Sequence, residues 1–220
     1  MILTIVIMSF IALLGCDGSG KSAVIHQVSE RLRAEGIQVA CGHWRPKAFF
    51  SDTAHGVGVV FDNPHGKAPR GQVVSLMKLA WLWLNWWMGW WRGMRKLSHH
   101  GVVLFDRFHG DLLVDPQRYR YGGSLMLARI AVRLMPQPDM ILFLDAAPEI
   151  LLSRKQEVSR ESLEQSRHRY VEMGKRYACF RIIDVNQPLE CVVDEVMARI
   201  MDQLMMVNSV KQNADVQAIS

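Results

Sequence analysis

The sequence predicts an α/β fold in which a five-stranded parallel sheet lies between two layers of helices. Short apolar segments, each about the length of one strand, alternate with segments whose apolar residues recur at helical spacing. Half of the residues are hydrophobic, as expected of a sheet that is buried on both faces. We expect residues 1–206 to form one domain, and the polar residues 207–220 to form a frayed, disordered tail.

The composition limits the classes of partner. The formal net charge is +5, which suits a protein that binds phosphates, but no long basic run indicates binding of nucleic acid. The cysteines are far apart and form no CxxC pair, so neither a zinc site nor a disulfide framework is predicted. We therefore expect a cytoplasmic protein. The cysteines are Cys16, Cys41, Cys179 and Cys191.

The first strand is predicted to begin near residues 8–10, because five or six residues before the following loop are enough for a strand. Residues 1–14 are apolar and could be mistaken for a signal peptide. No basic residue precedes them, however, and no small-residue cleavage site follows. Residues 1–7 are either an extension or the result of a wrongly assigned start.

Residues 15–22, Gly-Cys-Asp-Gly-Ser-Gly-Lys-Ser, fit the phosphate-loop pattern G-x-x-x-x-G-K-[ST] at each fixed position. An apolar strand precedes the loop and an amphipathic helix follows it, as this motif requires. Backbone N–H groups of such a loop surround the phosphates, the lysine reaches the β and γ phosphates, and the hydroxyl of Ser22 binds Mg²⁺. The motif thus predicts a three-layer P-loop fold. The expected ATP-binding residues are Gly15, Asp17, Gly18, Ser19, Gly20, Lys21 and Ser22.

A second strand is predicted over residues 37–43, before the Trp-Arg-Pro sequence that ends it. Arg45 then lies at the carboxyl end of this strand, where α/β sheets bind ligands, so it could bind the acceptor or be an exposed structural arginine. Residues 47–70 have no clear periodicity and form a long connection. His55 and His65 lie there without ligand spacing, so we expect solvated histidines rather than a metal site.

Residues 73–97 form a predicted helix that is apolar almost all round and rich in tryptophan. Lys78, Asn85 and Arg92 recur every seven residues and form one polar stripe. This stripe would lie in hydrocarbon if the helix crossed a membrane, so a membrane-spanning helix is the least favoured interpretation. A buried or cleft-lining helix is favoured, and a helix that contacts a membrane surface or a partner protein is the alternative.

A third strand, residues 101–106, ends at Asp106. Its carboxylate should face the triphosphate and, with Ser22, bind the metal ion. The later loop at residues 117–123 carries Arg118 and Arg120, which could close over an anionic acceptor or form a basic surface turn. The remaining predicted helices are residues 112–115, 125–135, 148–155, 161–178 and a last helix ending near 206, and the remaining strands are residues 139–145 and 179–184.

The order of these motifs resembles a known family. The phosphate loop contains an aspartate, a later strand ends in Asp-Arg-Phe at 106–108, and the strand at 140–145 ends in aspartate before Pro148 and Glu149. An arginine-bearing segment follows. Over residues 9–204 the chain resembles thymidylate kinase-like proteins of the nucleoside monophosphate kinase group. The resemblance implies ATP- and Mg²⁺-dependent transfer of a phosphoryl group to a nucleoside monophosphate such as thymidine monophosphate.

The resemblance also implies roles for particular residues. Asp17 matches the acidic phosphate-loop residue on the acceptor side, and Asp106 and Arg107 match the pair that organises the metal and holds the acceptor phosphate. An ion pair with Asp106 or Asp111 is the alternative for Arg107. Arg154 and Arg160 match the lid arginines, or are ordinary exposed helix charges. Asn186 and Gln187 occupy the loop where the family binds adenine.

The sequence departs from the family on the acceptor side. Residues 45–49, Arg-Pro-Lys-Ala-Phe, replace the Pro-Gly-Gly turn of thymidylate enzymes, and tryptophans fill the helix where base-contacting arginines are expected. Two alternatives therefore stay open. One is a kinase whose acceptor is a phosphosugar or a lipid-linked glycan, and the other is an ATP-binding switch that acts through the tryptophan-rich helix. A homodimer is also left open.

Overall fold

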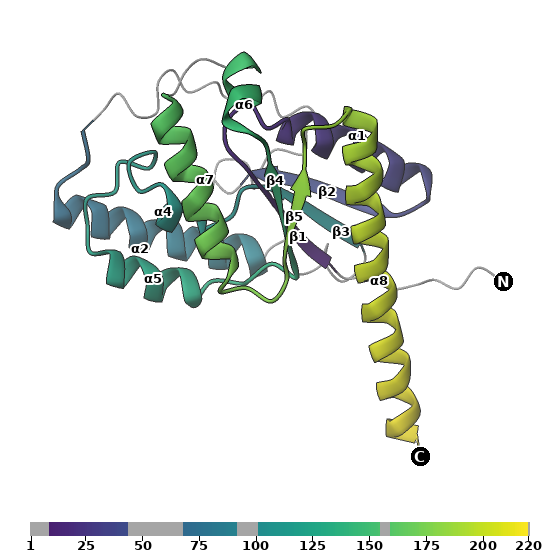
Figure 1. Cartoon of the computed structure of the whole chain (residues 1–220). Coiled ribbons are helices and arrows are strands. Elements are labelled where there is room, and N and C mark those ends of the chain that lie inside the picture. Colours follow the sequence, from purple (N-terminus) through teal and green to yellow (C-terminus); the bar gives the residue numbers. More distant parts are fainter. Residues whose placement is uncertain (1–8, 44–67, 92–100, 155–158, 220) are drawn as a thin grey trace.

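The computed structural model describes residues 9–43, 68–91, 101–154 and 159–219. Five parallel strands form one open sheet with the order β2-β3-β1-β4-β5 (Figure 1), which confirms the predicted five-stranded parallel sheet. Strand β1 lies at its centre and pairs with both β3 and β4. The strands are β1 (Ser9–Leu14), β2 (Gln38–His43), β3 (Gly101–Asp106), β4 (Met140–Asp145) and β5 (Phe180–Asp184).

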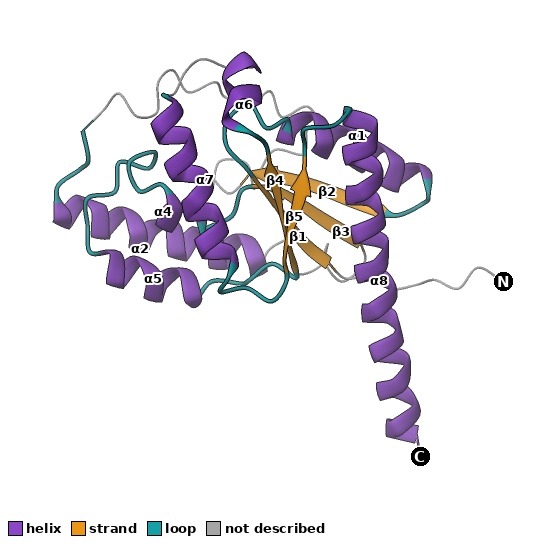
Figure 2. Ribbon diagram, in the orientation of Figure 1, coloured by secondary structure: helices purple, strands orange, loops and turns teal. Residues whose placement is uncertain are grey.

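Helices cover both faces of this sheet. Helices α1 and α8 lie together on one face, and α2, α4, α5 and α7 lie on the other (Figures 1 and 2). The chain is therefore an α/β fold of three layers. The helices are α1 (Lys21–Ala34), α2 (Gln72–Gly89), α4 (Asp111–Val114), α5 (Leu125–Arg133), α6 (Pro148–Arg154), α7 (Arg160–Gly174) and α8 (Leu189–Ile219).

The buried strands alternate their side chains between the two helical layers. On one face Phe10 packs edge-on against Phe105 and contacts Trp86 of α2. Ile11 and Leu104 belong to the core beneath α1 and α8. Full burial of one such side chain stabilises the fold by roughly 1.5–3 kcal/mol. The apolar strands therefore contribute much of the hydrophobic stabilisation of the core.

Helix α2 is buried along one stripe only. The inward residues lie at helical spacing and pack on β1 and β3, whereas the opposite stripe is exposed. The prediction of a buried helix is thus confirmed for one face of α2. The inward residues are Ser75, Leu79, Leu82, Trp86 and Gly89. Within the described part of the chain, no helix combines the length and apolar character needed to cross a membrane.

The prediction for the end of the chain was wrong. Helix α8 does not stop near Met206 before a disordered tail, but continues as helix to Ile219, beyond the sheet (Figure 2). Its first half is anchored by buried Val193, Val196 and Ile200. The polar residues that follow include no glycine or proline. Polar composition alone therefore does not end a helix whose earlier turns are already fixed by packing.

Candidate phosphate-binding site

The phosphate loop joins β1 to α1, as its sequence predicts. Lys21 is the first residue of α1, and its ammonium donates to the carbonyls of Gly15 at 3.0 Å and Cys16 at 2.9 Å. It also lies 3.3 Å from the hydroxyl of Ser19. The loop therefore wraps around its own lysine at the N-terminus of a helix, where the helix dipole favours an anion.

Burial changes the proton affinity of this lysine. The side chain is almost completely buried, and desolvation, aided by the nearby guanidinium of Arg107, lowers the pKa of Lys21 from 10.5 to about 8. The carboxylates of Asp106 and Asp17 act in the opposite direction. A buried ammonium with a lowered pKa gains most from a bound phosphate, because the anion replaces lost solvation.

Two glycines allow the loop to turn. Gly18 has φ 87° and Gly20 has φ 83°, in the left-handed region that glycine enters without steric cost. Gly20 also caps the N-terminus of α1, where its carbonyl accepts from the N–H of Val24 at 3.0 Å. A residue with a Cβ atom at either position would strain the turn that presents the loop N–H groups.

Ser22 and Asp106 are the residues beside the loop whose oxygen atoms could bind a metal ion. Ser22 is exposed in the first turn of α1, and Asp106 is the last residue of β3, paired in register with Leu13 just before the loop. The Oδ1 atom of Asp106 is buried and has no hydrogen-bond partner among the described residues. Hydroxyl and carboxylate oxygens are hard donors, so this pair fits Mg²⁺.

Asp17 brings together two arginines from distant parts of the sequence. Its Oδ1 atom accepts from Nη2 of Arg107 at 2.8 Å, and its Oδ2 atom accepts from Nη1 of Arg118 at 2.7 Å. Burial alone would raise the pKa of Asp17, but Arg107 and Arg118 outweigh it and hold that pKa well below its usual range. Three of the predicted acceptor-side residues therefore form one charged cluster beside Lys21.

Arg107 is held from its other side by a buried cage that sequence reasoning did not find. Its Nη1 atom donates to Asp111 Oδ2 at 3.0 Å and to the Tyr170 hydroxyl at 2.7 Å. The hydroxyls of Tyr119 and Tyr170 both donate to Asp111. Burial and the neighbouring carboxylate raise the pKa of both tyrosines well above the usual value, so they remain hydrogen-bond donors.

One sequence signal did point to part of this cage. Asp111 follows Arg107 by four residues, and an ion pair between them was one alternative predicted from the sequence. The structure contains this ion pair as well as the one between Arg107 and Asp17. The backbone of Arg107 has φ 67°, which is uncommon for a residue other than glycine. Its N–H donates to the carbonyl of Leu13 at 2.9 Å. This turn carries the chain out of β3 and places the guanidinium beside the loop.

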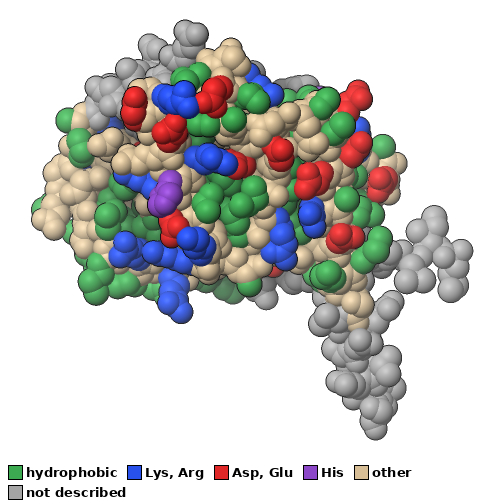
Figure 3. Space-filling model, in the orientation of Figure 1, with side chains coloured by type: hydrophobic (Ala, Val, Ile, Leu, Met, Phe, Trp, Pro, Cys, Tyr) green, Lys and Arg blue, Asp and Glu red, His purple; other side chains and the backbone are tan. Residues whose placement is uncertain are grey.

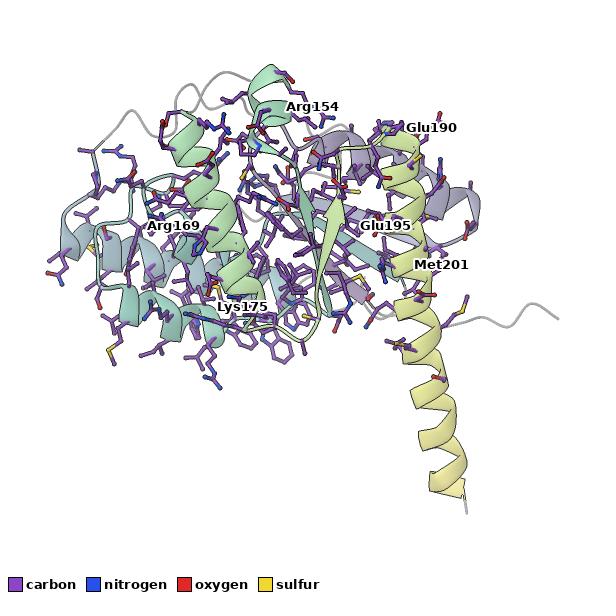
Figure 4. All side chains as sticks on the ribbon, viewed as in Figure 1. Arg154, Arg169, Lys175, Glu190, Glu195 and Met201 are labelled. Carbon is purple, nitrogen blue, oxygen red and sulfur yellow. The ribbon has the colours of Figure 1, made fainter. Side chains whose placement is uncertain are left out.

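The other predicted arginines are not brought into this cluster. Arg120 donates to the carbonyl of Ala68 at 3.1 Å. Arg154 ends α6 with an exposed side chain (Figure 4). Arg160 begins α7, where it is exposed and pairs with Glu149 and Glu164. This agrees with the alternative interpretation that Arg160 is an ordinary exposed charge on a helix. Arg45 lies outside the described residues.

A further ion pair at the edge of the site was missed by the sequence analysis. Asp145, the last residue of β4, accepts two hydrogen bonds from Arg167 of α7, at 2.6 and 2.7 Å. Asn186 also has a structural contact, because its Oδ1 atom accepts from the N–H of Ala147 at 3.0 Å. The side chain of Gln187 donates to the carbonyl of Asp184 at 2.8 Å. Through these contacts α7 is bound to the end of β4, and the residue before α6 is bound to the loop after β5.

The charged cluster opens onto a small recess between the phosphate loop and α7. Its lining residues are Cys16, Asp17, Arg107, Asp115, Arg118, Leu163, Ser166 and Tyr170. A larger cavity of about 410 Å³ lies at the amino end of β2 and is lined by residues including Arg33, Ile37 and Gln38. We assign the candidate site to the recess, because the recess, unlike the larger cavity, borders the phosphate loop and the buried charges. No protein family model matches the chain.

Proposed function

We propose that the protein is an ATP- and Mg²⁺-dependent phosphotransferase that resembles thymidylate kinase. It transfers the γ-phosphoryl group of ATP to a nucleoside monophosphate such as thymidine monophosphate. The observation that carries the proposal is the contact of Asp17, inside the phosphate loop, with both Arg107 and Arg118. A switch that only binds ATP has no acceptor phosphate, so two guanidinium groups beside the loop favour phosphoryl transfer to a phosphorylated acceptor.

The donor side rests on the phosphate loop. Lys21, at the start of α1, would hold the β and γ phosphates together with the loop N–H groups. Ser22 and Asp106 would hold Mg²⁺. When bound, the ion would supply positive charge that offsets the negative charge developing in the transition state.

The acceptor side rests on the two arginines. Guanidinium groups bind phosphate through paired, charge-assisted hydrogen bonds, and Arg107 is fixed in place by its contacts with Asp111 and Tyr170. In the reaction an oxygen of the acceptor phosphate attacks the γ phosphorus, the bond between this phosphorus and the β–γ bridging oxygen breaks, and ADP leaves. The protein positions both phosphates and stabilises the shared negative charge.

A second acceptor class is favoured by one observation on α2. The inward face of this helix holds apolar residues and Ser75, and α2 contains no arginine. Its lysine, Lys78, donates to the carbonyl of Tyr119 at 3.0 Å, so α2 offers little for recognising a nucleobase through arginine contacts. The alternative acceptor is a phosphosugar or a lipid-linked glycan. The chemistry at the phosphate loop is the same for both acceptor classes.

A phosphoryl-transfer assay distinguishes these possibilities. The purified full chain is incubated with γ-labelled ATP and Mg²⁺, separately with thymidine monophosphate, other nucleoside monophosphates and phosphosugars, and ADP and labelled product are both measured. Turnover of thymidine monophosphate with kcat/KM of about 10⁴ M⁻¹s⁻¹ or more supports the proposal. Transfer to a sugar acceptor alone establishes the second candidate. Slow hydrolysis without transfer to any acceptor contradicts both and favours an ATP-binding switch.

A further inference from the structure

Helix α2 has an exposed apolar stripe opposite the one that packs on the sheet. Its outward residues recur every three or four positions and include Trp81, which is 52% exposed. Trp91, two residues beyond the end of α2, continues the stripe and is 60% exposed. Monomeric proteins seldom leave such a stripe open to water unless it has a binding role. The stripe comprises Val73, Val74, Met77, Trp81, Leu84, Met88 and Trp91.

Helix α5 extends this apolar surface. It packs against α2 on the same side of the sheet and buries Ala128 and Val132. Its exposed apolar residues are Leu125, Met126, Leu127 and Ile130, and Leu134 follows directly. We call the exposed apolar residues of α2 and α5, together with Trp91 and Leu134, the α2–α5 surface.

The charge on these two helices has one sign. Neither α2 nor α5 contains an acidic residue, whereas Arg129 and Arg133 of α5 are exposed beside the apolar stripe. In Figure 3 hydrophobic and basic side chains gather at the lower left, where α5 lies in Figure 1. Most acidic side chains on the visible face lie over its upper part and right side, and one lies among the basic side chains at the lower left.

We propose that the α2–α5 surface binds the surface of an anionic lipid bilayer. Apolar and tryptophan side chains would enter the region between the headgroups and the acyl chains, while Arg129 and Arg133 would contact the anionic headgroups. Tryptophan favours this region over both water and the bilayer centre. The helices lie along the membrane and do not cross it.

The charge distribution favours a bilayer over a second copy of the chain. In a dimer with twofold symmetry the same surface patch faces itself. Arg129 and Arg133 would then approach their own copies, and α2 and α5 hold no carboxylate to neutralise them. An anionic bilayer provides the apolar environment and the opposite charge together. This inference concerns a different surface from the phosphate loop and does not depend on the proposed reaction.

Vesicle binding followed by tryptophan fluorescence tests this proposal. Six of the seven tryptophans lie between residues 81 and 91, so the intrinsic emission reports mainly on α2. The full chain is mixed with vesicles of phosphatidylcholine, with or without phosphatidylglycerol. We expect about tenfold tighter binding to the anionic vesicles, a blue shift of the emission, quenching by lipids brominated in the acyl chains, and weaker binding at high salt.

Matched variants locate the binding surface. Trp81→Glu combined with Met126→Glu should reduce vesicle binding about tenfold or more, because each change places a charge in the interface. Arg129→Glu combined with Arg133→Glu should remove the preference for anionic lipid. Met206→Glu changes an exposed apolar residue of α8 and should have no effect. Circular dichroism and thermal melting establish that each variant is folded.

Several results would overturn the proposal. These are the absence of cosedimentation with anionic vesicles, equal binding to neutral and anionic vesicles, and equal loss of binding in Met206→Glu. Sedimentation velocity provides a further test. A dimer that the Trp81 and Met126 changes convert to monomer, in a protein that does not bind vesicles, would assign the surface to a second copy of the chain.

Discussion

The guanidinium of Arg107 lies 2.8 Å from the carboxylate of Asp17 although 90 residues separate them in the chain. The same guanidinium contacts Asp111 on its opposite side, so one arginine links the phosphate loop to the buried cage behind it. Because Arg107 is only 4% exposed, these charges are desolvated, and their mutual contacts decide whether the cluster is stable.

Replacing Lys21 tests the donor side. Lys21→Met removes the ammonium that would hold the β and γ phosphates, so kcat/KM for phosphoryl transfer should fall about 10²- to 10³-fold, as for loss of one preorganised donor. MgATP affinity, measured by isothermal titration calorimetry, should fall as well. Lys175→Met is the control, because Lys175 is an exposed lysine of the segment after α7 that pairs with Glu172. Unchanged affinity and turnover in Lys21→Met would contradict the donor site.

Replacing Arg118 tests the acceptor side. Its guanidinium contacts Asp17 and is 20% exposed, so Arg118→Gln removes the proposed charged contact with the acceptor phosphate without emptying the core. We expect the KM for the acceptor to rise about tenfold or more, whereas the KM for ATP changes little. The exposed Arg176→Gln serves as the control. An equal rise in both KM values would show that Arg118 does not act on the acceptor alone.

Asp111 should be essential for stability rather than only for activity. The carboxylate is completely buried and accepts from Arg107, Tyr119 and Tyr170. Asp111→Asn leaves Arg107 without its buried partner and should lower the free energy of unfolding by about 3–5 kcal/mol, as measured in urea. The exposed Asp202→Asn should change it by less than about 0.5 kcal/mol. A small effect of Asp111→Asn would mean that Asp17 alone is sufficient for Arg107.

Tyr170→Phe provides a graded version of the same test. It removes one hydroxyl that donates to Asp111 and accepts from Arg107, while the ring can keep its contact with Phe143. We expect a loss of about 1–3 kcal/mol in the free energy of unfolding. A loss as large as that of Asp111→Asn would indicate that the hydrogen bonds of the Tyr170 hydroxyl stabilise the cage as much as the buried carboxylate does.

His109 should make the protein sensitive to mild acid. It is completely buried, contacts the ring of Trp86, and burial lowers its pKa from 6.5 to about 3. Between these values the unfolded chain binds a proton that the folded protein does not, so stability falls as the pH decreases through this window. From pH 6.5 to pH 5 the loss should be about 2 kcal/mol.

Urea unfolding at a series of pH values checks this prediction. His109→Leu removes the titrating group and should flatten the profile between pH 6.5 and pH 5, whereas exposed His168→Asn should leave it unchanged. Asp17 and Asp111 affect the stability of the fold at lower pH than His109 does. Because their pKa values are lowered in the fold, the stability that they contribute is lost only as the pH falls below about 4. Equal profiles for wild type and His109→Leu would contradict the prediction.

The sequence by itself predicted the five strands, the existence of the helices and the glycine-rich turn of residues 15–22 between β1 and α1. These features depend on patterns within one short window: an apolar run for β1, helical spacing for α1, and glycines at 18 and 20 where the backbone turns into the left-handed region. The parallel sheet followed from the alternation of strands and helices. Asp106 was expected at the sheet's ligand-binding edge because it ends a buried strand.

Only the tertiary structure decided which charges meet. Arg118 is 101 residues from Asp17, and Tyr170 is 59 residues from Asp111, so no local pattern specifies their contact. Sheet order and helix packing bring these residues together. Packing also decides how much of α2 is exposed, because an apolar helix sequence does not specify which of its faces a neighbour will cover. Likewise α8 continues to Ile219, because its earlier turns are fixed by packing and its polar end contains no residue that stops a helix.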